Sequence, residues 1–386
     1  MLETENRLRH ALEQRESQDS LRRLTVGEGL VDFCSNDYLG FSRSEILKER
    51  IRDEVAKHTS SMVGSTGSRL ISGNSKYCEG LEEFIADFHH AESGLIFNSG
   101  YDANIGLFSS IPQRTDTILF DQLVHASIRD GIRLNNARAF SFRHNDVADL
   151  ERRLKAQQSD GPAEQITKHI FVAAESVYSM DGDCSPLSEM TEVCERYGAN
   201  LIVDEAHATG VFGKSGEGKV AELGLENRIF ARVHTFGKAL GSHGAIVLGS
   251  NTLRSYLINF ARSFIYTTAL PFHSLASIRC AYEVLASDKE QMSGLKEGVR
   301  FFKSRIGPGL ADKMMPSESA IQCVVIPGNS KVKAIAKGIR EAGSDVRAIM
   351  HPTVPSGAER LRICLHSFNT QEEIENLTNR LGALSQ

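Results

Sequence analysis

The chain has 386 residues, of which 41% are hydrophobic and 24% charged, so it is an ordinary globular protein long enough for two or three folding units. A formal net charge of -5 without a lysine–arginine cluster argues against nucleic-acid binding, and the apolar runs are far shorter than the roughly 20 residues that span a bilayer. Seven cysteines without a Cys-x-x-Cys pair, and first residues unlike a signal peptide, predict a cytoplasmic protein with neither a disulfide framework nor a bound metal.

In chain order, residues 1 to about 23 predict a charged amphipathic helix, an arm that packs on the body or on another subunit. Residues 32–40 follow as a short strand that runs into a turn. From about 46 to 270, short apolar runs alternate with helical patterns such as 77–88 and 147–156. The predicted strands are 94–98, 117–120, 138–142, 169–174, 200–203, 231–235 and 245–248. Buried strands that alternate with helices predict an α/β fold, with a mostly parallel sheet covered on both faces.

The remainder of the chain has a different pattern. A helical stretch runs from Pro271 to about 287 and precedes a strand at 320–326, a helix at 331–342, a strand at 362–365 and a helix at 370–384. This order is typical of a small α+β unit. We therefore expect an N-terminal arm (1–45), a large α/β domain (46–275) and a C-terminal α+β domain (276–386).

Polar residues directly follow five of the predicted strands. In open α/β sheets ligands bind beyond the carboxyl ends of the strands, so these residues are candidates for a single site. They are Ser99-Gly-Tyr101, Asp121 to His125, Glu175 to Ser179, Asp204-Glu-Ala-His207 and Phe236-Gly-Lys238.

Asp204-Glu-Ala-His207 has two interpretations. It spells the DEAH box of a helicase, but that class needs an upstream Gly-x-x-x-x-Gly-Lys-Ser/Thr loop. The nearest candidate, 213–220, lies downstream and lacks the Ser/Thr hydroxyl of that loop.

The second interpretation is a site for pyridoxal 5′-phosphate (PLP), which needs a carboxylate at its ring nitrogen and a lysine for its aldehyde. Asp204, at the end of a buried strand, and Lys238, between glycines 237 and 241, suit these tasks. Ser99-Gly-Tyr101 at a helix start offers N–H groups to the phosphate. The combination favours PLP.

Motifs along nearly the whole chain then resemble the α-oxoamine synthases, PLP enzymes of the aspartate-aminotransferase fold (fold type I). The block Gly64-Ser-Thr-Gly-Ser-Arg-Leu70 is most similar to the branch of that family that makes 8-amino-7-oxononanoate. The other matching segments are 35–40, 99–104, 179–183, 203–210, 235–238, 266–271, 352–355 and 360–362.

Carried over position by position, the resemblance implies which residues surround the PLP ring. Lys238 would bind the cofactor aldehyde and later move the α-proton of the amino acid. Asp204 would pair with the pyridine nitrogen, and His125 would stack over the ring face. His207 and Ser179 would hold the side with the ring hydroxyl, although Ser179 could also be only a turn residue.

The remaining implied roles concern the phosphate and the substrates. Around the phosphate the resemblance places Ser99, Gly100, Tyr101 and Thr235, joined from the second subunit of a homodimer by Thr268. Arg362 would bind the carboxylate of the amino acid, and Asn36 and Arg22 would line the substrate mouth, although Arg22 could be only a surface charge.

The implied reaction is decarboxylative condensation of L-alanine with pimeloyl-CoA or pimeloyl-carrier protein, which yields 8-amino-7-oxononanoate, CO2 and free thiol for biotin. Another α-oxoamine synthase, such as glycine C-acetyltransferase or serine palmitoyltransferase, an aminotransferase and a catalytically silent PLP-fold protein are the alternatives. Met350 stands where many members of the oxononanoate branch have arginine, which leaves the acyl chain and its thiol carrier open.

Overall fold

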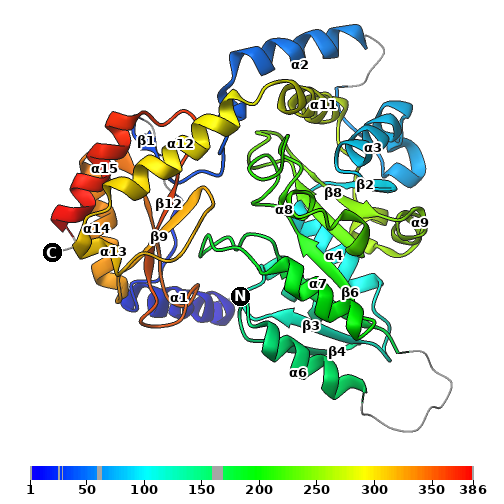
Figure 1. Cartoon of the computed structure of the whole chain (residues 1–386), viewed down its shortest axis with the longest axis horizontal. Coiled ribbons are helices and arrows are strands. Elements are labelled where there is room, and N and C mark those ends of the chain that lie inside the picture. The colour runs from blue at the N-terminus through cyan, green and yellow to red at the C-terminus, as the bar shows by residue number, and fades with distance from the viewer. Residues whose placement is uncertain (1, 25–26, 28, 59–62, 159–167, 385–386) are drawn as a thin grey trace. The chain divides into compact units, whose positions relative to one another are not determined.

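A computed structural model describes residues 2–24, 27, 29–58, 63–158 and 168–384. Two compact units make up the chain (Figure 1). The larger contains residues 37–179 and 184–292, and the smaller contains 1–36, 180–183 and 293–386. The expected division into an arm, a large domain and a C-terminal domain stays a prediction.

The larger unit contains a seven-stranded sheet in the order β2-β8-β7-β6-β5-β3-β4. β8 is antiparallel to both of its neighbours, whereas the other pairs are parallel, which confirms the predicted α/β class. The strands are β2 (Ser93–Phe97), β3 (Thr117–Asp121), β4 (Arg138–Phe142), β5 (Ile170–Glu175), β6 (Asn200–Asp204), β7 (Ala231–Thr235) and β8 (Ala245–Gly249). The helices are α2 (Glu45–Lys57), α3 (Lys76–Phe88), α4 (Gly100–Ser110), α5 (Ala126–Arg133), α6 (Val147–Gln158), α7 (Leu187–Arg196), α8 (Lys219–Glu222), α9 (Asn251–Phe260), α10 (Arg262–Ile265) and α11 (Phe272–Ser287).

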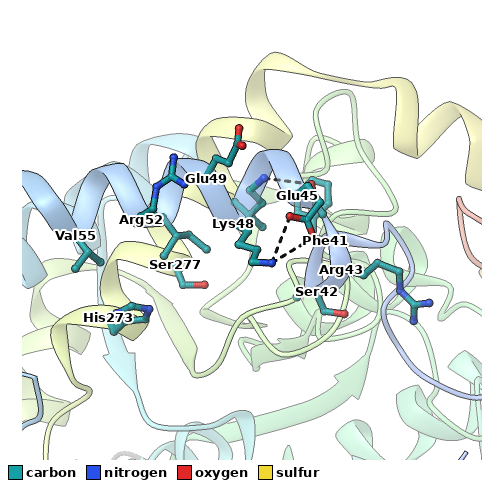
Figure 2. Close-up of a pocket in the computed structure, with 14 residues that line it drawn as sticks. Phe41, Ser42, Arg43, Glu45, Lys48, Glu49, Arg52, Val55, His273 and Ser277 are labelled. Atoms are coloured by element: carbon teal, nitrogen blue, oxygen red, sulfur yellow. Dashed lines mark hydrogen bonds and ion pairs between the residues drawn. The ribbon is translucent and has the colours of Figure 1, made fainter. Parts of the chain in front are cut away.

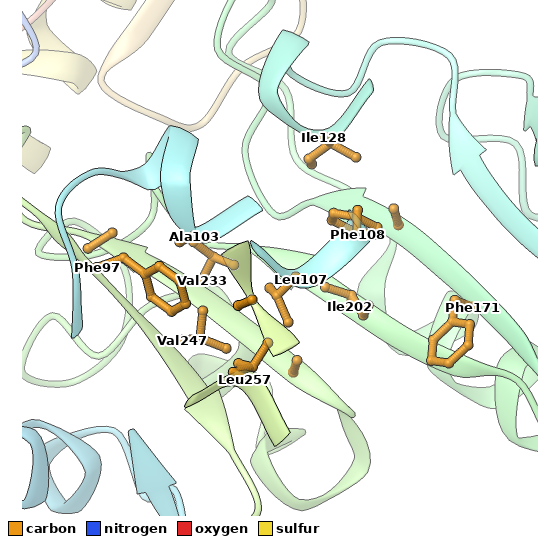
Figure 3. Close-up of a cluster of buried hydrophobic side chains, with 14 of the residues drawn as sticks. Phe97, Ala103, Leu107, Phe108, Ile128, Phe171, Ile202, Val233, Val247 and Leu257 are labelled. Atoms are coloured by element: carbon orange, nitrogen blue, oxygen red, sulfur yellow. The ribbon is translucent and has the colours of Figure 1, made fainter. Parts of the chain in front are cut away.

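Helices cover both faces of this sheet, because alternate residues of each strand point to opposite sides. On one face, side chains such as Ile202 and Val233 pack against Leu107 and Phe108 of α4, Ile128 of α5 and helices α9 and α10 (Figure 3). On the other face, Leu201 and Val203 pack with α6, α7 and α8. β4 departs from the expectation of a buried strand: it is the edge strand, and all its residues except Phe142 are exposed.

The smaller unit contains an antiparallel sheet in the order β11-β12-β9 and a parallel pair, β1 with β10. Its strands are β1 (Val31–Asp32), β9 (Ile321–Val325), β10 (Ser344–Asp345), β11 (Arg347–Ile349) and β12 (Arg360–Cys364). Its helices are α1 (Leu2–Ser17), most of α12 (Glu290–Arg305), α13 (Pro308–Ala311), α14 (Asn329–Glu341) and α15 (Gln371–Leu384). α1 buries none of its side chains against the described chain, but Asp19 and Arg22 after it pair with Lys333 and Thr353 of the same unit. Contact of the arm with another subunit stays a prediction. Among the described residues, none of the helices has the length and hydropathy to cross a membrane.

Candidate active site

Five strands of this sheet are followed directly by polar residues. The carboxyl ends of these five strands lie at the same edge of the sheet. β7, β6, β5 and β3 are consecutive, parallel neighbours. β8 separates β2 from β7 and is antiparallel to both, so β2 runs in the same direction as the other four. Strand alternation then places Glu175, Asp204 and Thr235 on the face that α4 and α5 cover, because Ala173, Ile202 and Val233 belong to that core.

Asp204 is a buried carboxylate whose plane is fixed by two hydrogen bonds. Its Oδ1 accepts from the backbone N–H of Ala206 at 2.9 Å, and its Oδ2 accepts from Nδ2 of Asn104 on α4 at 2.8 Å. Only 6% of its surface is exposed. Each oxygen keeps a lone pair for a further donor, as a protonated ring nitrogen requires.

Lys238 and His207 are in direct contact. The Nζ of Lys238 lies 2.8 Å from Nε2 of His207, and Nδ1 of His207 lies 2.7 Å from the hydroxyl of Tyr38. Tyr38 and His207 are buried, and Lys238 is half-buried. Gly241 adopts φ +57° in the turn after Lys238, and an added Cβ there would lie 2.3 Å from the backbone N of Ser42. The turn that carries the amine is therefore packed against the 41–43 backbone.

His125 is the N-cap residue of α5, and its ring is exposed. Its Nδ1 lies 2.8 Å from the hydroxyl of Ser127, and its backbone N–H donates to the buried Glu175. Desolvation by the surrounding protein lowers the pKa of His125. The negative charge of Asp204 opposes this decrease, whereas the positive charge of Lys238 adds to it. Burial, followed by the charge of Asp204, raises the pKa of Glu175 well above the usual carboxyl range.

The start of α4 is pressed onto the end of β7. A Cβ on Gly100 would lie 2.6 Å from Cγ2 of Thr235, so glycine lets the first N–H groups of the helix approach this strand end. Ser99 caps the helix, since its hydroxyl accepts from the N–H of Asp102 at 3.0 Å. The hydroxyl of Tyr101 donates to Asp130 of α5 at 2.7 Å.

Thr268 and Ser179 occupy loops of the larger unit. Thr268 is exposed, and its carbonyl accepts from Nδ2 of Asn98, directly after β2, at 2.8 Å. Ser179 is half-buried in the segment after β5.

The three residues expected to bind substrate all lie in the smaller unit. Nη2 of Arg362 donates to Oδ1 of Asn36 at 2.9 Å, and 8% of the surface of Arg362 is exposed. Nη2 of Arg22 donates to Oγ1 of Thr353 at 3.2 Å, and the N–H of Thr353 donates to the carbonyl of Met350 at 2.8 Å. Arg22 therefore lies on the turn that Met350 begins.

These donors and acceptors fit PLP in the larger unit. Asp204 suits the ring nitrogen, Lys238 the aldehyde, His207 the ring hydroxyl and the start of α4 the phosphate. The helicase interpretation needs Asp204 and Glu205 to act together. Instead, Glu205 projects to the opposite face and accepts the N–H groups of Lys219 and Val220 at the start of α8.

One cavity of about 840 Å³ lies between α2, α11 and the 41–45 segment, and none of the candidate site residues lines it (Figure 2). Charged side chains on its wall pair with acidic neighbours: Lys48 with Glu45, and Arg43 with Asp37. The cavity therefore lies outside the candidate site.

The sequence analysis placed Glu175 among the residues that follow a strand but gave it no role, and it gave none to Tyr38, Asn104 or Ser127. Two of these four residues had a signal in the sequence. Asn104 is an amide on the apolar face of a helix that begins at the phosphate position, and Glu175 is a carboxylate at the end of a buried strand. The hydroxyls of Tyr38 and Ser127 are recognisable only from their partners in the fold.

Tyr38→Phe should lower kcat about three- to tenfold, because it removes a hydrogen bond that orients the ring of His207 against Lys238. The measurement is kcat together with the pH titration of the absorption of bound PLP. Tyr282→Phe is the matched control, since it removes a buried 2.8 Å tyrosine–histidine bond to His89 in the same unit. The control should cost stability and leave the titration unchanged. Identical kinetics in the two variants would contradict a role for Tyr38.

Comparisons with known proteins were consistent with one another. The family model described as aminotransferase class I and II matches residues 28–381. The chain is 47% identical to 8-amino-7-oxononanoate synthase of Emericella nidulans, over 98% of this chain and 95% of that protein. Among solved structures, a variant of serine palmitoyltransferase from S. paucimobilis with bound PLP has a TM-score of 0.87 at 26% identity, covering 100% of this chain and 98% of the other. An 8-amino-7-oxononanoate synthase from Francisella tularensis has a TM-score of 0.74 at 27% identity, covering 93% and 97%.

Proposed function

This chain belongs to the aminotransferase class I and II family and, within it, to the α-oxoamine synthases, and we propose that it condenses L-alanine with a pimeloyl thioester to give 8-amino-7-oxononanoate, CO2 and free thiol in biotin biosynthesis. It is a PLP-dependent acyltransferase. The observation that carries the proposal is the convergence of a lysine amine, a buried carboxylate and two imidazoles beside the start of α4.

When bound, PLP withdraws electrons from the amino acid and makes its α-proton acidic. The Nζ of Lys238 is proposed to remove and return that proton, and Asp204 to hold a proton on the ring nitrogen. The N–H groups of Gly100 and Tyr101 would hold the phosphate with Thr235, and Ser179 would join His207 at the ring hydroxyl. The paired Arg362 and Asn36 would bind the amino-acid carboxylate, which a guanidinium recognises through two parallel hydrogen bonds.

The test of this function is product analysis. The purified holoenzyme is given alanine, glycine or serine with pimeloyl, acetyl or palmitoyl thioesters of CoA, and pimeloyl-carrier protein is offered in addition. Mass spectrometry identifies the aminoketone, and CO2 and thiol are measured in parallel. We expect alanine and pimeloyl to give the highest kcat/KM. Preference for glycine with acetyl-CoA, or for serine with palmitoyl-CoA, would replace the proposed substrates.

Arg22 is proposed to supply the cation that Met350 does not. Its guanidinium contacts the 350–353 turn through Thr353, and its side chain is exposed and therefore accessible to a carboxylate, such as the one at the far end of a pimeloyl chain. Such a contact would distinguish pimeloyl from uncharged chains of similar length.

Arg22→Ala should lower the ratio of kcat/KM for pimeloyl-CoA to that for a neutral acyl-CoA of similar length by about tenfold, the lower end of what a charge-assisted hydrogen bond contributes. Alanine is held saturating throughout. Arg23→Ala is the matched control, because Arg23 is the adjacent arginine and pairs with Glu16 on the exposed arm. Equal ratios in wild type and both variants would remove Arg22 from substrate selection.

The enzyme is proposed to be a cytoplasmic homodimer with shared active sites. All seven cysteines are free thiols, as a reducing compartment favours. Thr268 is exposed although its carbonyl is held beside the end of β2, and the nearby Ile71 and Tyr266 expose 85% and 73% of their surfaces. Exposed large apolar side chains such as Ile71 and Tyr266 are typical of a subunit interface.

Mixing Lys238→Ala chains with phosphate-impaired Thr268→Asp chains should restore activity, since one site of each heterodimer then contains both native residues. Lys238→Ala mixed with Asp204→Asn is the control, because both residues lie in the same unit of one chain and every site stays defective. A protein that is monomeric and active at assay dilution would contradict the shared site.

A further inference from the structure

A buried chain of hydrogen bonds connects Asp204 with His125. Nδ2 of Asn104, on the second turn of α4, donates to Oδ2 of Asp204 at 2.8 Å and to the hydroxyl of Ser127 at 3.0 Å. The Ser127 hydroxyl lies 2.8 Å from Nδ1 of His125. Asn104 and Ser127 expose 1% and 0% of their surfaces, so water does not compete for the bonds that join Asp204, Asn104 and Ser127, whereas His125 is exposed at the end of the chain.

The protons of this chain have only one consistent direction. The amide nitrogen of Asn104 can only donate, so one lone pair of the Ser127 hydroxyl accepts from it. Among the hydrogen-bond contacts of this hydroxyl in the described residues, Nδ1 of His125 is the acceptor for its proton. The backbone N–H of Ser127 points at the same nitrogen, at 3.2 Å. In the neutral ring the proton of His125 therefore lies on Nε2.

The carboxylate of Asp204 determines the orientation of the Asn104 amide. Turning the amide over would place Oδ1 of Asn104 against the carboxylate of Asp204, two acceptors that repel each other. In the orientation observed, Oδ1 of Asn104 is buried without a hydrogen-bond partner within the described residues, an unfavourable state for a polar atom. A local cost of this kind is one that functional sites retain.

We propose that Asn104 and Ser127 are positioning residues of the active site, which hold the carboxylate of Asp204 for the cofactor ring and keep the imidazole of His125 neutral with its proton on Nε2. The inference rests on the proposed function, because that function gives His125 and Asp204 their roles.

The charges around His125 oppose one another. Asp204 on β6 and Asp130 on α5 favour its protonation, whereas Lys238 after β7 disfavours it. Glu175 on β5 accepts from the backbone N–H of His125, and burial raises the pKa of that carboxyl, which favours its uncharged form near neutral pH. A positively charged ring would need a proton on Nδ1, where two donors from Ser127 already point. These donors add to the desolvation that lowers the pKa of His125.

Ser127→Ala tests the chain in the holoenzyme. Loss of the hydroxyl makes protonation of Nδ1 easier, so the acidic limb of the kcat–pH profile should move up by about half to one pH unit. The pH titration of the absorption of bound PLP should move in the same direction. Ser127→Thr retains a hydroxyl and should restore the wild-type limb, and the shift should vanish when His125→Phe is added to Ser127→Ala.

Thr191→Val is the matched control, since it removes a buried hydroxyl from α7 on the other face of the sheet and should leave both profiles unchanged. Asn104→Ala provides an independent measurement. It should raise the dissociation constant of PLP about tenfold, because Asp204 loses a hydrogen bond that fixes its plane.

Superimposable profiles for wild type and Ser127→Ala, or an acidic limb that moves down, would overturn the inference. If the wild type makes a different aminoketone, the proposed substrates fail, but the PLP titration still reads the state of His125. The two failures are therefore distinguishable.

Discussion

Lys238→Ala should lower kcat by at least about 10³-fold, the scale of a group that transfers a proton in the transition state. The amine of Lys238 lies 2.8 Å from Nε2 of the buried His207, in a turn that Gly241 fixes against the 41–43 backbone. The purified wild type should be yellow, and borohydride should attach PLP to the peptide that contains Lys238. The same treatment of Lys238→Ala should leave that peptide unlabelled.

Lys219→Ala is the control for this experiment. Lys219 belongs to the Gly-Lys segment that the helicase interpretation would have used, and its amine pairs with Glu222 at 2.5 Å. Its loss should leave the colour and the labelled peptide unchanged. Label on any other lysine, or a colourless protein that ignores added PLP, would rule out Lys238 as the cofactor lysine.

Asp204→Asn should lower kcat/KM by about 10²–10⁴-fold and weaken PLP binding, for two reasons. The amide does not carry the charge that keeps a ring nitrogen protonated. In addition, both oxygens of Asp204 accept hydrogen bonds, from Ala206 and Asn104, so the new NH2 group would face a donor on one side. Activity and the PLP dissociation constant are measured together, and the fold is checked by thermal unfolding.

Glu205→Gln is the matched control for Asp204→Asn. It neutralises the adjacent buried carboxyl, and it affects the opposite face of the sheet. Burial raises the pKa of that carboxyl to about 7. We expect lower stability with PLP binding retained. Near-wild-type activity of Asp204→Asn, or equal loss of PLP in the two variants, would remove the special role of Asp204.

Local sequence pattern alone predicted the fold class and most of the strand positions. Short apolar runs that alternate with helical patterns indicate a covered parallel sheet, and the strands β4 and β7 begin and end at the predicted residues. The position of Asp204 and Lys238 directly after strands was enough to suggest a shared site, because parallel strands end at one edge. These are properties of neighbouring residues, so the sequence contains them.

Strand order was not available from the pattern. β8 lies between β2 and β7, so β2 is not a neighbour of the other four strands that polar residues follow. β4 contains Phe140 and Phe142 and yet is an exposed edge strand apart from Phe142, because burial depends on what covers a strand as well as on its own residues. The exposed surface of α1 likewise follows from its place in the fold.

The hydrogen bonds that complete the site depended entirely on the tertiary structure. Tyr38 reaches His207 across 169 residues, Asn104 reaches Asp204 across 100, and Arg22 reaches Thr353 across 331. Strand register and helix packing set such contacts to within tenths of an ångström, and periodicity in the sequence carries no record of that geometry. The sequence therefore predicted which groups would touch the cofactor, whereas only the folded chain determined which side chains orient them.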